Sequence, residues 1–243
     1  MNKALVSLTF DDGLCSQFER AVPVLDRYGF PATFFLVANT DPIFTDGWAE
    51  VNGFEWHKID WGKEDIGLLK AIIDRGHEIG AHTITHKRQS IAANPEFEAV
   101  ESKRLIERWL GTQIPSFCYP FYDTTQLLKD PTIKAGFRQA RAGKQNSYYA
   151  SADSLDRFAV DCRQILQTGE NVPAWARPGC WHVVTFHGIG GDQDGWVPIT
   201  ETEFTRQIEE LAKLRDSGRV EVVTFKDGAE RLRQRSHTHD DGS

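Results

Sequence analysis

Three short apolar segments that end in ionisable residues constrain the fold of this chain more than any other feature of its sequence. Residues 5–13 run from apolar and β-branched side chains into two aspartates and a glycine, and residues 77–82 and 182–187 each end in a histidine. Segments of this kind are typical of buried strands that deliver polar side chains to one edge of a sheet. We therefore expect a sheet with acids and imidazoles gathered along one rim.

Helical signals separate these strands. Capping boxes at residues 16–19 and 200–203, and an Asn-Pro pair at residues 94–95, mark helix starts. Helices are expected at residues 16–28, 64–75, 94–110, 124–135 (in two pieces around Pro131), 200–217 and 226–232, and further strands at residues 32–38, 116–119, 137–140, 157–162 and 220–225. Right-handed crossovers close such a succession into a barrel or wind it into an open parallel sheet, and the pattern leaves both open. In either architecture the site lies at the carboxyl ends of the strands.

Length and composition indicate one α/β domain. No linker divides the 243 residues, so we expect a single domain over residues 1–232 and a disordered polar tail at residues 233–243. The net charge of −7 is spread along the chain and argues against nucleic acid as a partner. No apolar run of about 18 residues predicts a membrane span, and the first residues contain no secretory signal, which favours the cytoplasm. Four cysteines without a CxxC pair predict no thiolate zinc site but leave two disulfides possible, and the oligomeric state is left open.

His82 and His86 are the first candidates for metal ligands. On a helical turn, histidines four positions apart share one face and can chelate a divalent cation. With a carboxylate from another strand end they make a two-histidine, one-carboxylate set that leaves a coordination position open. Asp11 and Asp12 lie on extended backbone and point opposite ways, so one can bind the metal while the other faces its water. The alternatives are a chance spacing of histidines and an ordinary turn before Gly13.

Two of these segments together resemble a known family. Residues 9–13 (Thr-Phe-Asp-Asp-Gly) and 80–86 (Gly-Ala-His-Thr-Ile-Thr-His) are similar to the first two motifs of the polysaccharide deacetylases, which are carbohydrate esterase family four and share the NodB-homology domain. The likeness extends over most of residues 4–232. It implies an α/β fold of the distorted (β/α) barrel type with about seven parallel strands. It also implies an enzyme that removes acetyl groups from sugar polymers with a divalent metal, commonly Zn²⁺, with Co²⁺, Ni²⁺ or Mn²⁺ as other candidates.

The resemblance assigns a role to each rim residue. It implies that Asp12, His82 and His86 bind the metal and that Asp11 is the general base. His187 resembles the late histidine of the family, which acts as the general acid. The alternative for His187 is a core histidine that is satisfied by a backbone carbonyl.

The third motif departs from the family pattern. It commonly reads Arg-x-Pro-Tyr, but residues 118–121 read Cys-Tyr-Pro-Phe and lack the arginine that orients the base. Tyr119 falls in this motif, where a backbone N–H is expected to help hold the oxyanion. We expect Arg141 to replace the missing arginine beside Asp11, with an ordinary surface arginine as the alternative. The fourth motif is not recognisable, and position 188 is glycine where many relatives have aspartate.

The expected function is metal-dependent hydrolysis of acetyl groups from N-acetylated amino sugars of a poly- or oligosaccharide. An O-acetyl esterase acting on acetylated glycan and an allantoinase-like cyclic amide hydrolase are alternatives within the same fold. A non-catalytic carbohydrate-binding or metal-buffering module is an alternative from another class. Four aromatic residues in a long connection are expected either to stack on sugar rings beside the site or to pack that connection onto the barrel: Trp48, Phe54, Trp56 and Trp61.

Overall fold

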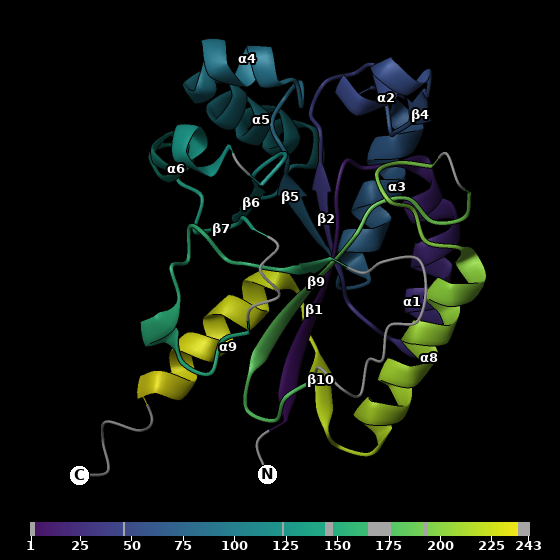
Figure 1. The fold of residues 1–243 in the computed structure, drawn as a ribbon, viewed down its shortest axis with the longest axis vertical. Helices are drawn as coiled ribbons and strands as arrows, with labels where there is room; N and C mark the ends of the chain where they lie inside the picture. Colours follow the sequence, from purple (N-terminus) through teal and green to yellow (C-terminus); the bar gives the residue numbers. More distant parts are fainter. Residues whose placement is uncertain are drawn as a thin grey trace.

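A curled sheet of parallel strands forms the centre of the protein (Figure 1). The computed structural model describes residues 3–45, 47–122, 124–143, 148–164, 176–191 and 194–237. The strands of the sheet are β1 (Ala4–Phe10), β2 (Thr33–Leu36), β5 (Glu78–Ala81), β6 (Ser116–Cys118), β7 (Gln139–Arg141), β8 (Arg163–Gln164), β9 (Trp181–Phe186) and β10 (Val220–Val222). Their order is β7-β6-β5-β2-β1-β9-β8, with β10 also paired to β1. A separate antiparallel pair consists of β3 (Ile43–Phe44) and β4 (Trp56–His57).

The sheet curls into a distorted barrel. One edge of β1 pairs with β9 along its length, and the other edge pairs first with β10 and then with β2. At the far side, Val160 N–H donates to Ala140 O (3.0 Å) and Ala142 N–H donates to Val160 O (2.7 Å), which ties β7 to the segment that enters β8. The expected (β/α) barrel is thus confirmed, and the open sheet is not the architecture.

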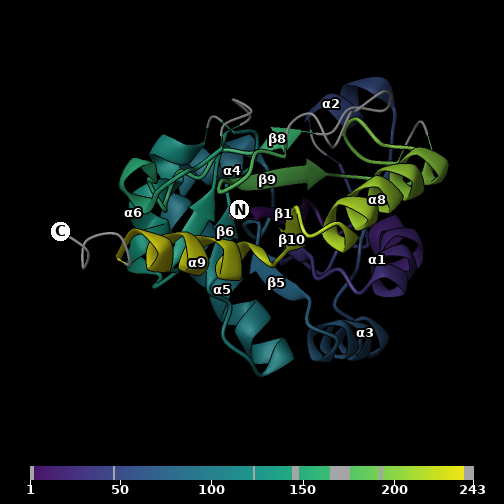
Figure 2. The ribbon, with the colours of Figure 1, turned by 90° about the horizontal axis from the view of Figure 1, so that it is seen from below.

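Helices surround this barrel (Figure 2). They are α1 (Val22–Tyr28), which follows the π-helical turn η1 (Gln17–Ala21), α2 (Gly47–Asn52), α3 (Lys63–Asp74), α4 (Arg88–Ala93), α5 (Pro95–Leu110), α6 (Thr125–Lys134), the short 3₁₀ turn η2 (Ala152–Ser154), α8 (Glu201–Asp216) and α9 (Phe225–His237). None of the described helices combines the length and the apolar composition that crossing a bilayer requires. All four cysteines are free thiols.

Side chains of the strands alternate between two buried layers, as the period of two requires. On β1 the even-numbered residues belong to the apolar cluster under the helices, whereas Leu5 joins Phe35 and Trp181 in a second cluster across the barrel interior. Gly80 of β5 makes room there, because a Cβ at position 80 would lie 2.5 Å from the Phe35 ring. Residues that continue the inward series past the strand ends therefore reach the rim from inside the barrel.

Four expectations about local structure are wrong. The Ser16 hydroxyl accepts from Ile189 N–H instead of capping its own helix. α6 is one continuous helix through Pro131, which is buried against its neighbours. Only Val160 of the expected strand at residues 157–162 forms a bridge, and β8 follows it.

The fourth concerns the last helix, which continues five residues beyond its expected end. α9 runs to His237, and Arg235 Nη1 donates to Gly179 O (3.1 Å) in the loop before β9. This contact docks the last turns of the helix on the barrel. Residues 238–243 of the expected tail lie outside the described residues.

Candidate active site

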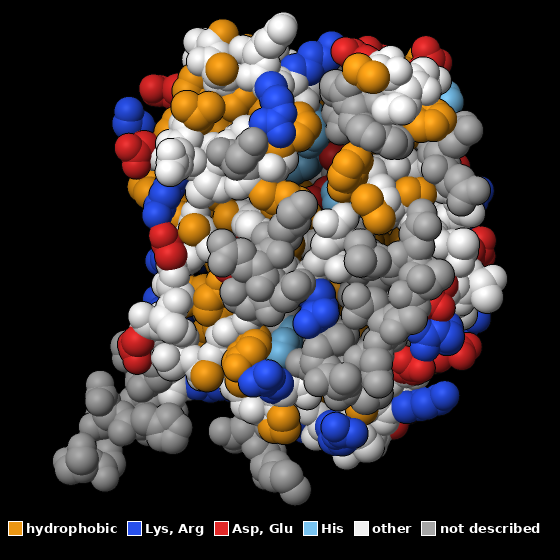
Figure 3. All heavy atoms as spheres, viewed as in Figure 1, with side chains coloured by type: hydrophobic (Ala, Val, Ile, Leu, Met, Phe, Trp, Pro, Cys, Tyr) orange, Lys and Arg blue, Asp and Glu red, His pale blue; other side chains and the backbone are white. Residues whose placement is uncertain are grey.

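A pocket of about 650 Å³ opens at the carboxyl ends of the strands. Figure 3 shows the hollow, with histidine and acidic side chains on its floor. Its lining consists of Asp11, Asp12, Thr45, Glu50, His82, His86, Lys87, Arg88, Gln89, Tyr119, Phe121, Tyr122, His187 and Trp196. Six of these are candidate site residues from the sequence, and the seventh candidate, Arg141, lies fully buried behind Asp11.

Asp12, His82 and His86 form a compact group. The Nε2 atoms of His82 and His86 lie 3.5 and 3.6 Å from Asp12 Oδ1. One ligand atom from each residue falls within 4.8 Å of the others, and all three residues are buried. Asp12 and His86 both have left-handed backbone, with φ of 76° and 53°, so the extended backbone expected at Asp12 is wrong. Non-glycine residues in this region are strained by about 1–3 kcal/mol and cluster at functional sites.

The two histidines meet through a loop, and the helical turn considered from their spacing is wrong. Glu98 of α5, which is 1% exposed, accepts from Ile84 N–H (2.8 Å), Thr85 N–H (3.0 Å) and Thr85 Oγ1 (2.6 Å). His86 N–H in turn donates to Thr83 Oγ1 (3.1 Å). The buried carboxylate thus supplies the hydrogen bonds that a helical turn would have made within its own backbone.

The protonation state of His82 and His86 suits metal binding. His82 Nδ1 lies 2.9 Å from Cys118 O, so its proton is on Nδ1 and the Nε2 lone pair faces Asp12. Burial lowers the pKa of His82 and, more strongly, that of His86. Two neutral imidazole nitrogens beside one carboxylate fit a divalent cation.

A second group of possible ligands, Asp11, His82 and Cys118, is also compact. The Arg141 guanidinium donates from Nη2 to both Asp11 Oδ2 and Cys118 Sγ, so a cation there would face a fixed positive charge. The Asp12 group is therefore the better metal site.

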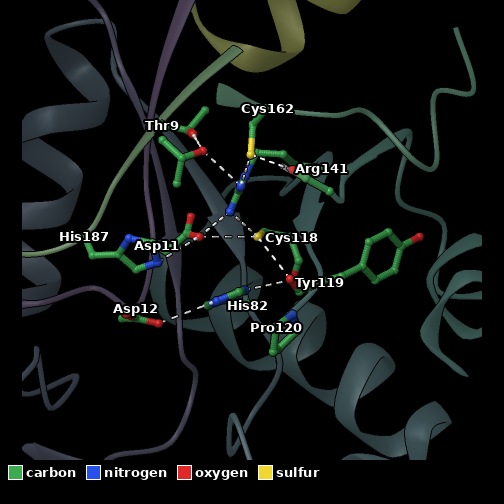
Figure 4. A network of polar contacts seen from close by, with 12 residues as sticks. Thr9, Asp11, Asp12, His82, Cys118, Tyr119, Pro120, Arg141, Cys162 and His187 are labelled. Atoms are coloured by element: carbon green, nitrogen blue, oxygen red, sulfur yellow. Dashed lines mark hydrogen bonds and ion pairs between the residues drawn. The ribbon is translucent and has the colours of Figure 1, made fainter. Parts of the chain in front are cut away.

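Arg141 is the partner of Asp11 (Figure 4). Its Nη2 forms an ion pair with Asp11 Oδ2, and its Nη1 donates to Thr185 Oγ1 (2.9 Å) and Cys162 Sγ (2.8 Å). The side chain is 0% exposed, so the alternative of a surface arginine is wrong. Arg141 lies in register with Cys118 on the neighbouring strand, which is the position where the family motif has its arginine. The guanidinium thus reaches Asp11 from β7 instead of β6.

The Asp11 carboxylate is held on one oxygen and open on the other. Burial by itself would raise the pKa of Asp11, but the Arg141 guanidinium and, where they are protonated, the His82 and His187 rings lower it below its usual value. Asp11 Oδ1 is buried and has no hydrogen-bond partner in the part of the chain that the structure describes. An ionised carboxylate with one unused oxygen can accept a proton from a bound molecule.

His187 lines the pocket on the other side of Asp11. Its Nε2 lies 3.7 Å from Asp11 Oδ2, so Asp11 is a neighbouring carboxylate of this ring. Burial lowers the pKa of His187 to about 4, against the raising effect of Asp11. The ring is therefore neutral near pH 7.

Tyr119 does not have the free backbone N–H that we expected. Its N–H donates to Arg141 O (3.0 Å) in the continuation of the β6–β7 ladder, and its hydroxyl donates to Phe158 O (2.9 Å). Phe121 occupies the tyrosine position of the Arg-x-Pro-Tyr pattern and lines the pocket. Its N–H has no acceptor among the described residues and its φ is 59°, so Phe121 is the better oxyanion candidate.

The expected sugar-stacking residues mostly pack the long connection. Trp56 and Trp61 are 1% and 5% exposed, and Phe54 packs against the cluster around Trp56. The side chain of Trp48 lies outside the described residues. Phe121, Tyr122 and Trp196 are among the aromatic residues that line the pocket instead.

Position 188 departs from the family for a local reason. A Cβ at Gly188 would lie 1.4 Å from Asp194 O, so the loop could not keep this path with an aspartate there. Asp194 Oδ2 accepts from Ile189 N–H (3.0 Å) and holds the loop in place.

Sequence reasoning missed several residues that support the site. Glu98 and Gln17 are polar residues in helical segments, and only their burial in the structure marks them, because such residues are rarely buried without a partner. Thr185 and Cys162 contact Arg141 only because distant strands meet, so no local pattern reveals them.

Sequence comparison links the chain to known proteins. The profile described as polysaccharide deacetylase matches residues 1–140. A peptidoglycan-N-acetylglucosamine deacetylase of Bacillus cereus is 26% identical over 112 residues, which cover 45% of this chain and 43% of that protein. The matched part thus spans less than half of that relative's length.

Solved structures share the fold. The Xyl-CE4 domain of a multidomain xylanase from the hindgut metagenome of Trinervitermes trinervoides has a TM-score of 0.58 and 17% identity, over 95% of this chain and 91% of that chain. A polysaccharide deacetylase from Bacillus cereus has a TM-score of 0.55 and 18% identity, over 92% of each chain. At sequence identities this low, the similarity shows a shared fold and nothing further.

Proposed function

The chain belongs to the polysaccharide deacetylase family, and from this premise we propose that it is a metal-dependent hydrolase that removes acetyl groups from N-acetylated amino sugars of a poly- or oligosaccharide. The observation that carries the proposal is the buried group of Asp12, His82 and His86 beside the open oxygen of Asp11. The amino-sugar substrate is favoured because one of the relatives that the chain matches is a peptidoglycan-N-acetylglucosamine deacetylase.

Asp12, His82 and His86 would hold the cation. Zn²⁺ is favoured because two imidazoles and a carboxylate are its usual donors at sites that keep a position open, and Co²⁺, Ni²⁺ and Mn²⁺ accept similar donors. When bound, such a cation lowers the pKa of a water molecule to about 7 and polarises the acetyl carbonyl.

Asp11 would act as the general base. Its open Oδ1 removes a proton from the water that attacks the acetyl carbon, while Arg141 holds Oδ2 in place. The Phe121 N–H stabilises the negative charge that develops on the carbonyl oxygen.

His187 would deliver the proton to the leaving nitrogen. The amine leaves poorly unless it is protonated, and His187 is the imidazole beside the Asp11 carboxylate, with its Nε2 3.7 Å from Oδ2, the oxygen next to the Oδ1 that takes the proton. Because burial keeps the ring neutral, it has a free nitrogen that receives this proton and passes it on.

The substrate is tested by acetate release from a panel. Chitooligosaccharide, acetylated xylan and allantoin are incubated with the Zn²⁺-loaded protein, and acetate or ring opening is measured. We expect acetate from chitooligosaccharide at a rate at least about tenfold above that from acetylated xylan, which corresponds to about 1.4 kcal/mol of preference in the transition state.

Each other outcome points to a stated alternative. Preference for acetylated xylan indicates an O-acetyl esterase, and ring opening of allantoin indicates a cyclic amide hydrolase. Glycan binding without any release indicates a non-catalytic module and contradicts the proposal.

Asp11→Asn tests the base. This change keeps the size of the side chain but removes its ability to take a proton, so kcat should fall about 10²–10⁴-fold. Zinc content should stay at the wild-type level, because Asp11 is not a proposed ligand.

The control for this variant is Asp26→Asn. Asp26 pairs with Arg75 and His77 away from the pocket, so its replacement should leave kcat of the folded protein unchanged. A nearly wild-type kcat in Asp11→Asn would remove Asp11 as the base.

A further inference from the structure

Gln17 lies behind the pocket and contacts both Asp11 and His187, the two residues that we propose to carry the proton. It is the first residue of η1 and is 0% exposed. Its Nε2 donates to the backbone carbonyl of Asp11 and to that of His187, the latter at 3.1 Å. One side-chain amide thus joins the residues that we propose as base and acid.

These two carbonyls lie where the β1–β9 ladder ends. The regular pairing reaches Phe10 and Phe186, and the last backbone bond runs from Asp11 N–H to Phe186 O (3.1 Å). Beyond this point both chains lead into the rim, and Asp11 and His187 are buried at 3% and 8% exposure. A buried carbonyl without a partner costs about 1–3 kcal/mol, so both need a donor.

Gln17 can serve both because a side-chain amide nitrogen carries two hydrogens. The opposite amide orientation would place Oε1 against two acceptors. Oε1 itself is buried and has no hydrogen-bond partner within the described ranges, so the amide is held by its nitrogen alone.

The rest of the η1 region holds the chain that follows His187. Ser16 Oγ accepts from Ile189 N–H (3.2 Å), and Arg20 Nη1 donates to Ile189 O (3.0 Å). A Cβ at Gly190 would lie 1.4 Å from Arg20 Nη1, so the backbone passes close to this arginine. π turns are rare and often occur at functional sites.

We propose that Gln17 is a positioning residue that sets the spacing between Asp11 and His187. By holding both backbone carbonyls it fixes how closely the His187 ring approaches the Asp11 carboxylate, 3.7 Å between Nε2 and Oδ2, so that the proton taken up on Oδ1 can pass to the ring. The inference rests on the proposed function, because it assigns Gln17 a role in that reaction. Gln17 acts through these two residues and does not touch the substrate.

The first test is Gln17→Met, which keeps the length of the side chain and removes the donors. We expect kcat for acetate release to fall about 10–100-fold, because a displacement of about 1 Å between reacting groups can cost about 100-fold. KM should stay within about threefold and zinc content should be unchanged, because neither the pocket wall nor the proposed ligands are altered.

The control is Gln207→Met. Gln207 is 3% exposed, and its Nε2 donates to Glu203 Oε1 (2.9 Å) on α8, so the same chemical change is made away from the site. Both variants are assayed at a temperature where circular dichroism shows them folded. Gln207→Met should lower the melting temperature but keep kcat. If Gln17→Met does not fold, Gln17→Asn replaces it, because the shorter amide cannot reach both carbonyls.

A double-mutant cycle separates positioning from a general structural role. In the Asp11→Asn background, Gln17→Met should lower the remaining kcat by less than about threefold, because the path that Gln17 aligns is already broken. Wild-type kcat in Gln17→Met, or an equal loss in both backgrounds, overturns the inference while the proposed function stands. An inactive Zn²⁺-loaded wild type refutes the proposed function and this inference with it.

Discussion

His86→Ala is expected to weaken Zn²⁺ binding more than about 100-fold and to abolish acetate release. Changes to residues that only contact metal ligands typically cost 10–100-fold in affinity, and His86 is itself one of three proposed ligands. Its Nε2 lies 3.6 Å from Asp12 Oδ1, so its removal leaves one imidazole and one carboxylate. Zinc content after dialysis and acetate release from chitooligosaccharide measure the two effects.

Two controls accompany this variant. His182→Ala removes a buried histidine whose Nε2 accepts from Arg177 N–H (3.0 Å), at the opposite end of β9 from His187, and should keep zinc and activity. Asp12→Asn changes the charge without changing the size and should behave like His86→Ala. In the wild type, a chelator should remove activity, and Zn²⁺ or Co²⁺ should restore it. Chelator-insensitive acetate release, or one tightly bound zinc in His86→Ala, would contradict the metal site.

Arg141→Met is expected to lower the free energy of unfolding by about 3–5 kcal/mol. Removal of one partner of a buried ion pair leaves the other charge uncompensated, and a loss of this size is typical. Asp11 is 3% exposed, and Arg141 is its only strong cationic neighbour in the described structure. Urea unfolding monitored by circular dichroism measures the change, and kcat should also fall because Asp11 loses its orientation.

The double variant Asp11→Asn/Arg141→Met checks the cause. Removal of both charges should recover part of the lost stability, because a neutral amide is easier to bury than an unpaired carboxylate. Arg104→Met is the control, since Arg104 pairs with Glu101 on the exposed side of α5 and should matter little. Wild-type stability of Arg141→Met would show that the pair does not support the fold.

The strand ends were predictable because their signals are local. An apolar run that stops at an ionisable residue predicts a buried strand end whatever surrounds it in the fold. The three residues at these ends, Asp11, His82 and His187, do meet in one pocket. Helix limits marked by caps were also predicted well, as Asn94 and Thr200 show by accepting from the backbone N–H three residues on. These interactions span only a few residues.

The errors arose where tertiary contacts replaced a local pattern. The loop that brings His82 to His86 takes its hydrogen bonds from Glu98, which lies on another element. The Tyr119 N–H donates to Arg141 O on β7. This bond depends on the register between β6 and β7, which neither strand specifies alone. The long connection that contains Trp56 and Trp61 packs inward because an apolar surface lies beneath it.

By itself, the sequence determined most of the strands, the residues at their tips and the family, because alternation, capping and motif spacing are properties of neighbouring positions. Only the tertiary structure decided that Arg141 from β7 reaches Asp11 and that Gln17 joins Asp11 to His187. Arg141 and Asp11 are 130 positions apart, and Gln17 and His187 are 170 apart. Their contacts exist because the sheet curls and the parallel strands pair in one register, and both are set by packing across the whole barrel.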